Sequence, residues 1–213
     1  MGRSKKQRIM EKLTMIWGWN PPQYEVRTDG ILLFFASKET TREVIRKDTE
    51  SEVERVETIN EWLCDTVMYV YDELGDMADM MRENPESLEC QKWMVKRMIE
   101  AYDGSSYVNT FTVGGYPTWL DKATRVGLKL RFEAEKRMGK TETILWQGGM
   151  QFRLPLVGET TALDMLDGIE LYASACYDVT QMHLAKVDVM ESVEEFKGYD
   201  YTSDYPEKLR FEV

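Results

Sequence analysis

The sequence predicts an α+β protein: an N-terminal hairpin and a long helical hairpin, then a β-hairpin-helix-β-hairpin-helix domain with an extended C-terminal segment. Three observations predict this class. An Asp-Gly pair precedes a short apolar run, a long stretch has apolar residues three and four apart, and two Gly-Gly pairs each precede a helical pattern. We expect four parts: a basic arm over residues 1–22, a β-hairpin over 23–36, a helical hairpin over 37–104 and the domain over 105–213.

Composition and charge limit the classes of function. The 213 residues include 27 Lys and Arg and 38 Asp and Glu, a formal net charge of −11. Such a surface repels phosphates, which argues against anionic membranes and sequence-specific nucleic acid as partners. No apolar run approaches the ~20 residues of a membrane span. Three scattered cysteines and a single histidine, His183, argue against a disulfide framework, a structural metal or a cofactor.

The first 22 residues carry a local excess of positive charge and end in two prolines. Trp17 and Trp19 precede Pro21-Pro22, which stops a helix and favours an extended path. The two indoles require burial, either under the body of the protein or in a neighbouring subunit, and are candidate interface residues. The alternatives for the charged start are a solvated terminus, an arm that touches nucleic acid or a positive tail that binds an acidic partner.

A hairpin is expected next. Gln23 to Arg27 is typical of a strand, with Tyr24 and Val26 on one face, Thr28-Asp29-Gly30 is the turn, and Ile31 to Phe35 is the return strand. The turn interpretation depends on Asp and Gly tolerating positive φ. Tyr24 is a further candidate interface residue.

Residues 37–104 have the pattern of two helices. Ser37 is the expected cap of the first, whose apolar positions are Val53, Val56, Ile59, Leu63, Val67, Val70, Leu74, Met77 and Met81. Asn84-Pro85 ends this helix, and the second carries Leu88, Met94, Val95, Met98 and Ile99 before it stops near Asp103-Gly104. The apolar stripe packs either against the rest of the chain or in a coiled coil.

The C-terminal half has the order hairpin, helix, hairpin, helix. Gly114-Gly115 and Gly148-Gly149 are the expected tight turns, 34 residues apart. Asp121 caps the first helix, which ends before Gly139, and Thr160 or Thr161 caps the second. We expect helices on one face of an antiparallel sheet. The apolar face of that sheet is expected to comprise Phe111, Trp119, Trp146, Phe152 and Leu154.

The last helix and the tail supply the other candidate interface residues. Every third or fourth residue from Ala162 to Met190 is apolar or small, and the small residues Ala173 and Cys176 indicate a close approach by the sheet or by another copy. The segment 199–213 has no helical period, so Tyr199, Tyr201, Tyr205 and Pro206 lie over a surface of this domain or of a neighbour.

No motif predicts catalysis. Gly139-Lys140-Thr141 resembles the end of a phosphate-binding loop, but Ala134 stands where that loop needs glycine, and a helix precedes it instead of a strand. His183 lies on the inner stripe of the last helix, where a packed histidine with one hydrogen-bond partner is expected. We therefore expect no enzyme.

Residues 105–211 carry a series of motifs that resembles a known domain family. They are Val108-Asn109-Thr110-Phe111-Thr112-Val113, Trp119-Leu120-Asp121-Lys122-Ala123-Thr124-Arg125, Thr143-Ile144-Leu145-Trp146, Cys176-Tyr177-Asp178-Val179-Thr180 and Tyr205-Pro206-Glu207-Lys208-Leu209. The series resembles a domain family of unknown function from bacteriophages and prophages of gut Bacteroidales, whose members sit among tail and other virion genes. The resemblance supplies no catalytic residues.

The resemblance implies a non-enzymatic virion structural protein, a repeated tail, neck or fibre component that contacts copies of itself and other virion proteins. It implies location in the virion after assembly in the bacterial host cytoplasm, and an acidic body suits proximity to packaged DNA. The alternatives are an assembly factor for a tail or fibre protein and, third, a small enzyme that uses His183. Residues 1–104 lie outside the resemblance.

Overall fold

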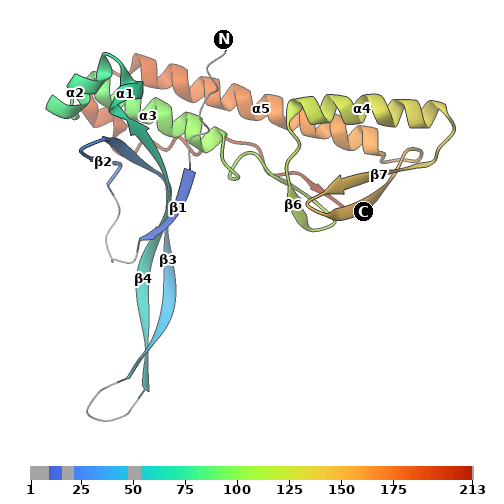
Figure 1. The fold of residues 1–213 in the computed structure, drawn as a ribbon, viewed down its shortest axis with the longest axis horizontal. Helices are drawn as coiled ribbons and strands as arrows, with labels where there is room; N and C mark the ends of the chain where they lie inside the picture. The colour runs from blue at the N-terminus through green and yellow to red at the C-terminus, as the bar shows by residue number, and fades with distance from the viewer. Residues whose placement is uncertain (1–9, 16–21, 48–53, 213) are drawn as a thin grey trace. The chain divides into compact units, whose positions relative to one another are not determined.

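The computed structural model describes residues 10–15, 22–47 and 54–212, which form a mixed α+β protein (Figure 1). The chain divides into two compact units. Unit 1 comprises Met1–Ala101 and Val187–Asp200, and unit 2 comprises Tyr102–Lys186 and Tyr201–Val213. The C-terminal part of the chain therefore contributes residues to both units.

Unit 1 contains a four-stranded antiparallel sheet in the order β1-β4-β3-β2. Its strands are β1 (Met10–Met15), β2 (Tyr24–Val26), β3 (Gly30–Lys47) and β4 (Glu54–Val70). The predicted long helix that begins at Ser37 is wrong, because residues 37–47 and 54–70 are strands. The coiled coil, one of the two alternatives for this stretch, is excluded for the same reason.

The physical reason for this correction is the β-branched content of the two strands. Thr40, Thr41, Val44 and Ile45 lose rotamer freedom in a helix but pack well on a pleated surface. Apolar residues three apart, which share one helical face, fall on opposite faces of a strand. The stripe predicted for a helix therefore supplies apolar side chains to both sides of β4.

The predicted hairpin at residues 23–36 is confirmed, and its return strand continues to Lys47. The Arg27 amide donates to the Gly30 carbonyl at 2.9 Å and closes the turn. Gly30 does not need positive φ, contrary to expectation. A Cβ at Gly30 would lie 2.1 Å from the Tyr69 carbonyl oxygen, so glycine permits the close approach of β3 to β4.

Three helices follow β4 in unit 1: α1 (Tyr71–Leu74), α2 (Met77–Glu83) and α3 (Leu88–Asp103), whose last two residues belong to unit 2. The predicted boundary at Asn84-Pro85 is confirmed, as is the end of the next helix at Asp103. The expected buried side of α3 is present as Met94, Val95, Met98 and Ile99. A 3-10 helix, η1 (Val193–Phe196), completes unit 1 with a Ser192–Glu195 capping box.

Unit 2 has the predicted order of hairpin, helix, hairpin, helix: β5 (Phe111–Val113), β6 (Tyr116–Thr118), α4 (Lys122–Arg137), β7 (Glu142–Gln147), β8 (Met150–Pro155) and α5 (Ala162–Val189). The two Gly-Gly pairs have matching positive φ angles of 54° and 81°, and of 56° and 81°. Positive φ at both central residues is the geometry of a type I′ hairpin turn.

Side-chain caps begin both long helices of unit 2, as expected. The Asp121 carboxylate accepts a hydrogen bond from the Thr124 amide at 2.8 Å. At the start of α5, Asp164 accepts from the Thr161 amide at 2.8 Å, and the Thr161 hydroxyl accepts from the Asp164 amide at 3.3 Å. Thr161, one of the two predicted caps, therefore starts α5.

The expectation of one antiparallel sheet in this unit is wrong. The two hairpins do not pair; β7 and β8 form a two-stranded sheet, and β5 pairs with β6 and, in parallel, with β9 (Arg210–Phe211). The C-terminal strand therefore occupies the edge of β5. Trp146 is 62% exposed, because β7 buries the alternate residues Thr143 and Leu145, so its predicted place in the core is also wrong.

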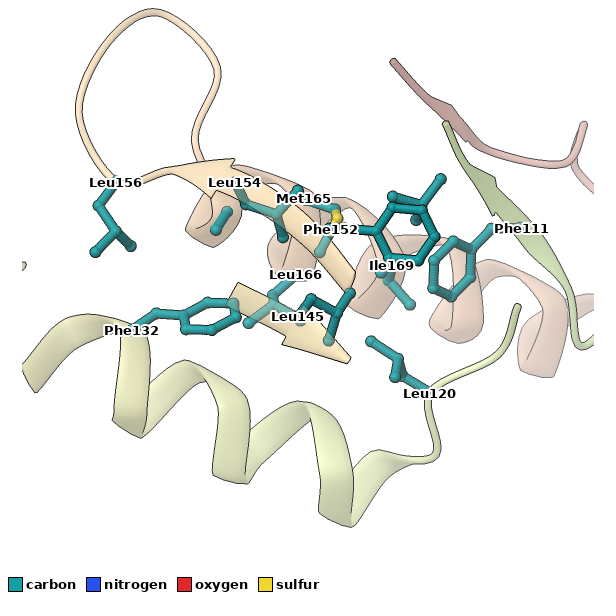
Figure 2. Close-up of a cluster of buried hydrophobic side chains, with 12 residues drawn as sticks. Phe111, Leu120, Phe132, Leu145, Phe152, Leu154, Leu156, Met165, Leu166 and Ile169 are labelled. Carbon is teal, nitrogen blue, oxygen red and sulfur yellow. The ribbon is translucent and has the colours of Figure 1, made fainter. Parts of the chain in front are cut away.

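The core of unit 2 joins these small sheets to two helices. Figure 2 shows side chains from β5, α4, β7, β8 and α5 converging, among them Phe111, Phe132, Leu145, Phe152 and Ile169. Trp119 and Phe211 pack against this cluster from its margin. Phe111, Phe152 and Leu154 are thus in the core as expected.

The predicted buried stripe of α5 is confirmed over its whole length. Alternating steps of four and three bury Leu166, Ile169, Cys176, Thr180 and His183, and then Val187 in unit 1. Ala173 is half-buried. The tail that follows contains the short 3-10 helix η1 and the short strand β9 and no α-helix, in agreement with its lack of helical period.

Candidate assembly interface

The most exposed regular structure in unit 1 is the distal half of the β3–β4 hairpin. We call residues 38–47 and 54–63 the ribbon; Figure 1 shows β3 and β4 continuing beyond β1 and β2. Ten residues of strand extend about 30 Å. β2 pairs with β3 only as far as Leu33, and β1 pairs with β4 only as far as Trp62. Among the described residues, no strand pairs with the outer edges of β3 and β4 beyond these points. An isolated two-stranded hairpin is marginally stable in water, which makes the ribbon a candidate for contact with a partner.

A β-bulge marks the start of the ribbon. Phe35 pairs with Asp65, but the next pair is Lys38 with Leu63, so β3 contains one extra residue. Ala36 within the bulge has a φ of 51°, a left-handed conformation that costs a non-glycine residue free energy. A bulge increases the local twist and changes the direction of the strands beyond it. The bulge therefore sets the direction in which the ribbon leaves the buried part of β3.

One face of the ribbon is basic. Directly opposite residues share a face, so the register places four cations and two carboxylates together. This basic face comprises Lys38, Thr40, Arg42, Val44, Arg46, Arg55, Glu57, Ile59, Glu61 and Leu63, with a net charge of +2. Arg42 bonds Glu61 at 2.6 Å and Arg46 bonds Glu57 at 2.8 Å. Both carboxylates are thus already paired within the face.

The opposite face of the ribbon is acidic. Up to the Ile45–Val56 pair it comprises Glu39, Thr41, Glu43, Ile45, Val56, Thr58, Asn60 and Trp62, with a net charge of −2, and the last pair, Lys47 with Glu54, leaves this net charge unchanged. Ile45 and Val56 lie directly opposite each other and are 63% and 64% exposed. The two faces therefore have opposite charge, and each carries apolar side chains that water solvates poorly.

The predicted interface residues do not gather at the ribbon. Trp17 and Trp19 lie outside the described residues. Tyr24 is half-buried in unit 1, where its hydroxyl donates to the Glu86 carboxylate. Burial, reinforced by the negative charge of Glu86, raises the pKa of Tyr24.

Unit 2 brings four of the predicted residues close to one another. Cys176 packs with Val108 and Tyr172, Tyr205 borders the same cluster, and the ring of Tyr201 meets that of Tyr102 edge-on at 6.2 Å. Pro206 is half-buried beside Tyr205. Tyr199 belongs to unit 1, where its amide donates to the Phe196 carbonyl at 3.2 Å. The tail segment after Tyr201 therefore packs on its own unit.

A buried polar network holds this tail segment against α5. The Thr180 hydroxyl lies 2.9 Å from both the Asp103 carboxylate and the Tyr205 hydroxyl. His183 Nε2 donates to the Ser203 carbonyl at 3.1 Å, and its ring stacks on Tyr205. Burial raises the pKa of Asp103, and it raises that of Tyr205 to about 12. His183 has the packed position expected from the stripe.

The described part of unit 2 contains at least two cavities. A cavity of about 300 Å³ lies between the end of β8, the start of α5 and β9, and is lined largely by apolar side chains. Another, of about 200 Å³, contains Glu135 and Glu142 beside Lys140 and the exposed Trp146. Lys140 bonds Glu135 at 3.1 Å, and the Thr143 hydroxyl lowers the pKa of Glu135.

The described residues include no group of three or more His, Cys, Asp or Glu side chains arranged to hold a metal ion. Cys64, Cys90 and Cys176 are buried and form no disulfide. No helix in the described ranges combines the length and apolar character that a membrane span requires.

No protein-family model, curated protein or solved structure matches this chain.

Sequence reasoning missed the ribbon, although a signal for it is present. In residues 39–46 the acids stand at odd positions and the arginines at even positions, and in residues 55–62 the charged residues stand at odd positions alone. Alternation with period two is the pattern of a strand whose two faces differ. The charged residues concealed this alternation, because charge-rich turns are equally typical of a solvated helix.

Proposed function

We propose that this protein is a non-enzymatic structural component of a bacteriophage virion, repeated in the tail or neck, that acts through contacts between its copies. One observation carries the assembly role: the ribbon, with apolar side chains exposed on a two-stranded hairpin. Exposed apolar groups on a projecting element are typical of interaction sites. The motifs in residues 105–211, which resemble a phage domain family, support the location in a virion.

The rest of the chain is consistent with a shaped building block. The core of unit 2 is closed by large buried side chains, and the C-terminal strand is paired to β5. The net charge of −11 suits a component near packaged DNA, because it prevents adhesion to the genome. Partners on this proposal are copies of the chain and other virion proteins, with assembly in the bacterial host cytoplasm.

An assembly factor that binds a tail or fibre protein and then leaves is the second candidate. An exposed ribbon serves transient binding as well as permanent contact. A small enzyme using His183 has less support. The imidazole is 2% exposed and its Nε2 donates to a backbone carbonyl, so it lacks the access to substrate that a general base requires.

Quantitative mass spectrometry of purified phage particles tests this proposal. A structural component is present in a fixed multiple of copies per particle, comparable to other ring or tail proteins. Presence in infected cells together with absence from mature particles would contradict it and support the assembly factor. For the enzyme, His183→Ala would remove an activity without altering incorporation into particles.

A further inference from the structure

The two faces of the ribbon are complementary to each other. We propose that the basic face of the ribbon in one copy of this chain packs on the acidic face of the ribbon in the next copy. The inference rests on the proposed function and adds to it the identity of the contact surface and of its occupant. Net charges of +2 and −2 on opposite sides of one element permit such pairing without any other partner.

The charges on the basic face favour an anionic partner. Arg46 and Arg55 lie directly opposite each other, and like charges at directly opposite positions repel. Of the two, Arg46 bonds an acid of its own face, Glu57, at 2.8 Å. A partner surface that presents carboxylates to this pair relieves the repulsion.

The spacing of the acids suits this contact. Consider two ribbons stacked in the same direction, so that equal residue numbers lie at the same level along the strands. Glu39 of one copy then lies one residue along the strand from the level of Lys38 in the other copy. Glu43 falls between the levels of Arg42 and Arg46, one residue from the first and three residues from the second along the strand, or about 3 Å and 10 Å. Stacked sheets lie about 10 Å apart, a distance that long Arg and Glu side chains span.

The exposed apolar residues of the acidic face are covered in the same arrangement. Ile45 and Val56 lie between the level of the Val44–Glu57 pair and the level of the Arg46–Arg55 pair on the basic face of the next copy. Burying the exposed parts of Ile45 and Val56 contributes about 1–2 kcal/mol for each side chain at most. The contact therefore combines apolar burial with charge pairing, which gives it both affinity and direction.

Pairing through the open edges is the competing geometry. In that arrangement neighbouring ribbons share one sheet, and all basic faces lie on one side of it. Cations of adjacent copies then lie next to one another, as do the acids, which is unfavourable. Stacking alternates the signs instead, so the charge distribution favours stacking over edge pairing.

A contact between different faces of identical chains is heterologous. Such contacts generate a closed ring when the rotation between copies closes and an open filament when it does not.

Charge reversal tests the proposal in the full-length protein. Lys38→Glu with Arg55→Glu changes the basic face to −2, and Glu39→Lys with Glu43→Lys changes the acidic face to +2. These four side chains are exposed, so the fold is expected to survive. Sedimentation velocity over a range of concentrations measures the association of each variant, of wild type and of an equimolar mixture of the two variants.

We expect wild type to form oligomers and each double variant to sediment as a 24.9 kDa monomer, with association weakened about tenfold or more. The mixture regains oligomers, because each variant presents the charge that the other lacks. Lys122→Glu with Arg137→Glu, an equal change of charge on α4, is the matched control and leaves association unchanged. Circular dichroism checks the fold of every variant.

Two results would overturn the proposal: wild type that stays monomeric at every concentration, and double variants that associate as wild type does. The second result, with oligomers retained, would indicate edge pairing or another surface and would leave the proposed function standing. Absence of the protein from purified particles, measured separately, would contradict the proposed function independently of the result for the ribbon contact.

Discussion

Arg125 of α4 and Glu170 of α5 form a bidentate ion pair, with Nε and Nη2 at 2.9 and 2.8 Å from the same carboxylate oxygen. Arg125 is buried, and its Nη1 also donates to the Leu120 carbonyl at 2.6 Å. One guanidinium therefore links both long helices of unit 2 to the loop that precedes α4. Lys129 and Asp167 join the same two helices at 2.6 Å, but at the solvent-exposed surface.

Replacement of Arg125 by Leu is expected to lower the free energy of unfolding by about 2–3 kcal/mol, because it leaves the Leu120 carbonyl and Glu170 without their donor. Urea unfolding followed by circular dichroism measures the change. Lys129→Met is the matched control and is expected to have little effect, since exposed ion pairs contribute little. Equal losses in the two variants would show that the buried pair has no special role.

The contribution of Asp103 to the stability of unit 2 is expected to fall as pH rises above about 4. Burial raises its pKa above the ordinary 3.8, so the folded chain keeps this proton to a higher pH than the unfolded chain. Its contribution to stability is therefore greatest below pH 3.8 and is lost as pH rises through the raised folded value.

Asp103→Asn tests this assignment, because asparagine cannot ionise yet still accepts the hydrogen bond from Thr180. We expect the variant to gain stability over wild type at pH 7 but not at pH 3, as measured by thermal unfolding. Asp178→Asn, at an exposed position on α5, is the control. A difference between wild type and Asp103→Asn that does not depend on pH would contradict the assignment.

Ala36→Gly is expected to stabilise unit 1 by about 0.5–1 kcal/mol, since glycine adopts the φ of 51° without the penalty of a Cβ. Ala36→Val has the opposite effect, because a β-branched side chain is poorly tolerated at positive φ. Chemical unfolding of both variants gives the comparison. A destabilised glycine variant would mean that this backbone conformation is not adopted in solution.

The ribbon is expected to be dispensable for folding. Residues 40–61 can be replaced by Asn-Gly, which suits a two-residue turn between the directly paired Glu39 and Trp62. Because most of the removed side chains that the structure describes are exposed, the melting temperature should change by no more than a few degrees, while self-association is lost. Collapse of the fold, or undiminished association, would contradict a role confined to assembly.

Local chemistry made most of unit 2 predictable from sequence. Gly114-Gly115 and Gly148-Gly149 specify their turns because few other residues adopt positive φ twice in succession. Asp121 and Thr161 begin helices through bonds that reach only three residues. The α5 stripe is long enough that only a helix places all its members on one side.

Long-range pairing was not predictable in the same way. Nothing local to Arg210 or Phe211 indicates that β9 adds in parallel to β5, or that the two hairpins stay in separate sheets. In residues 37–70, the spacing of apolar residues fits both a helix and a two-sided strand, and the cross-strand partner decides between them. The ribbon faces depend on that register, so the candidate interface could not be found without it.

An image of the purified phage particle by electron cryomicroscopy tests the central claim most directly. The account predicts several copies of this chain arranged about a symmetry axis in the tail or neck, with each ribbon stacked on that of its neighbour. The account would be contradicted by particles that lack the protein, or by particles in which the ribbons of neighbouring copies make no contact.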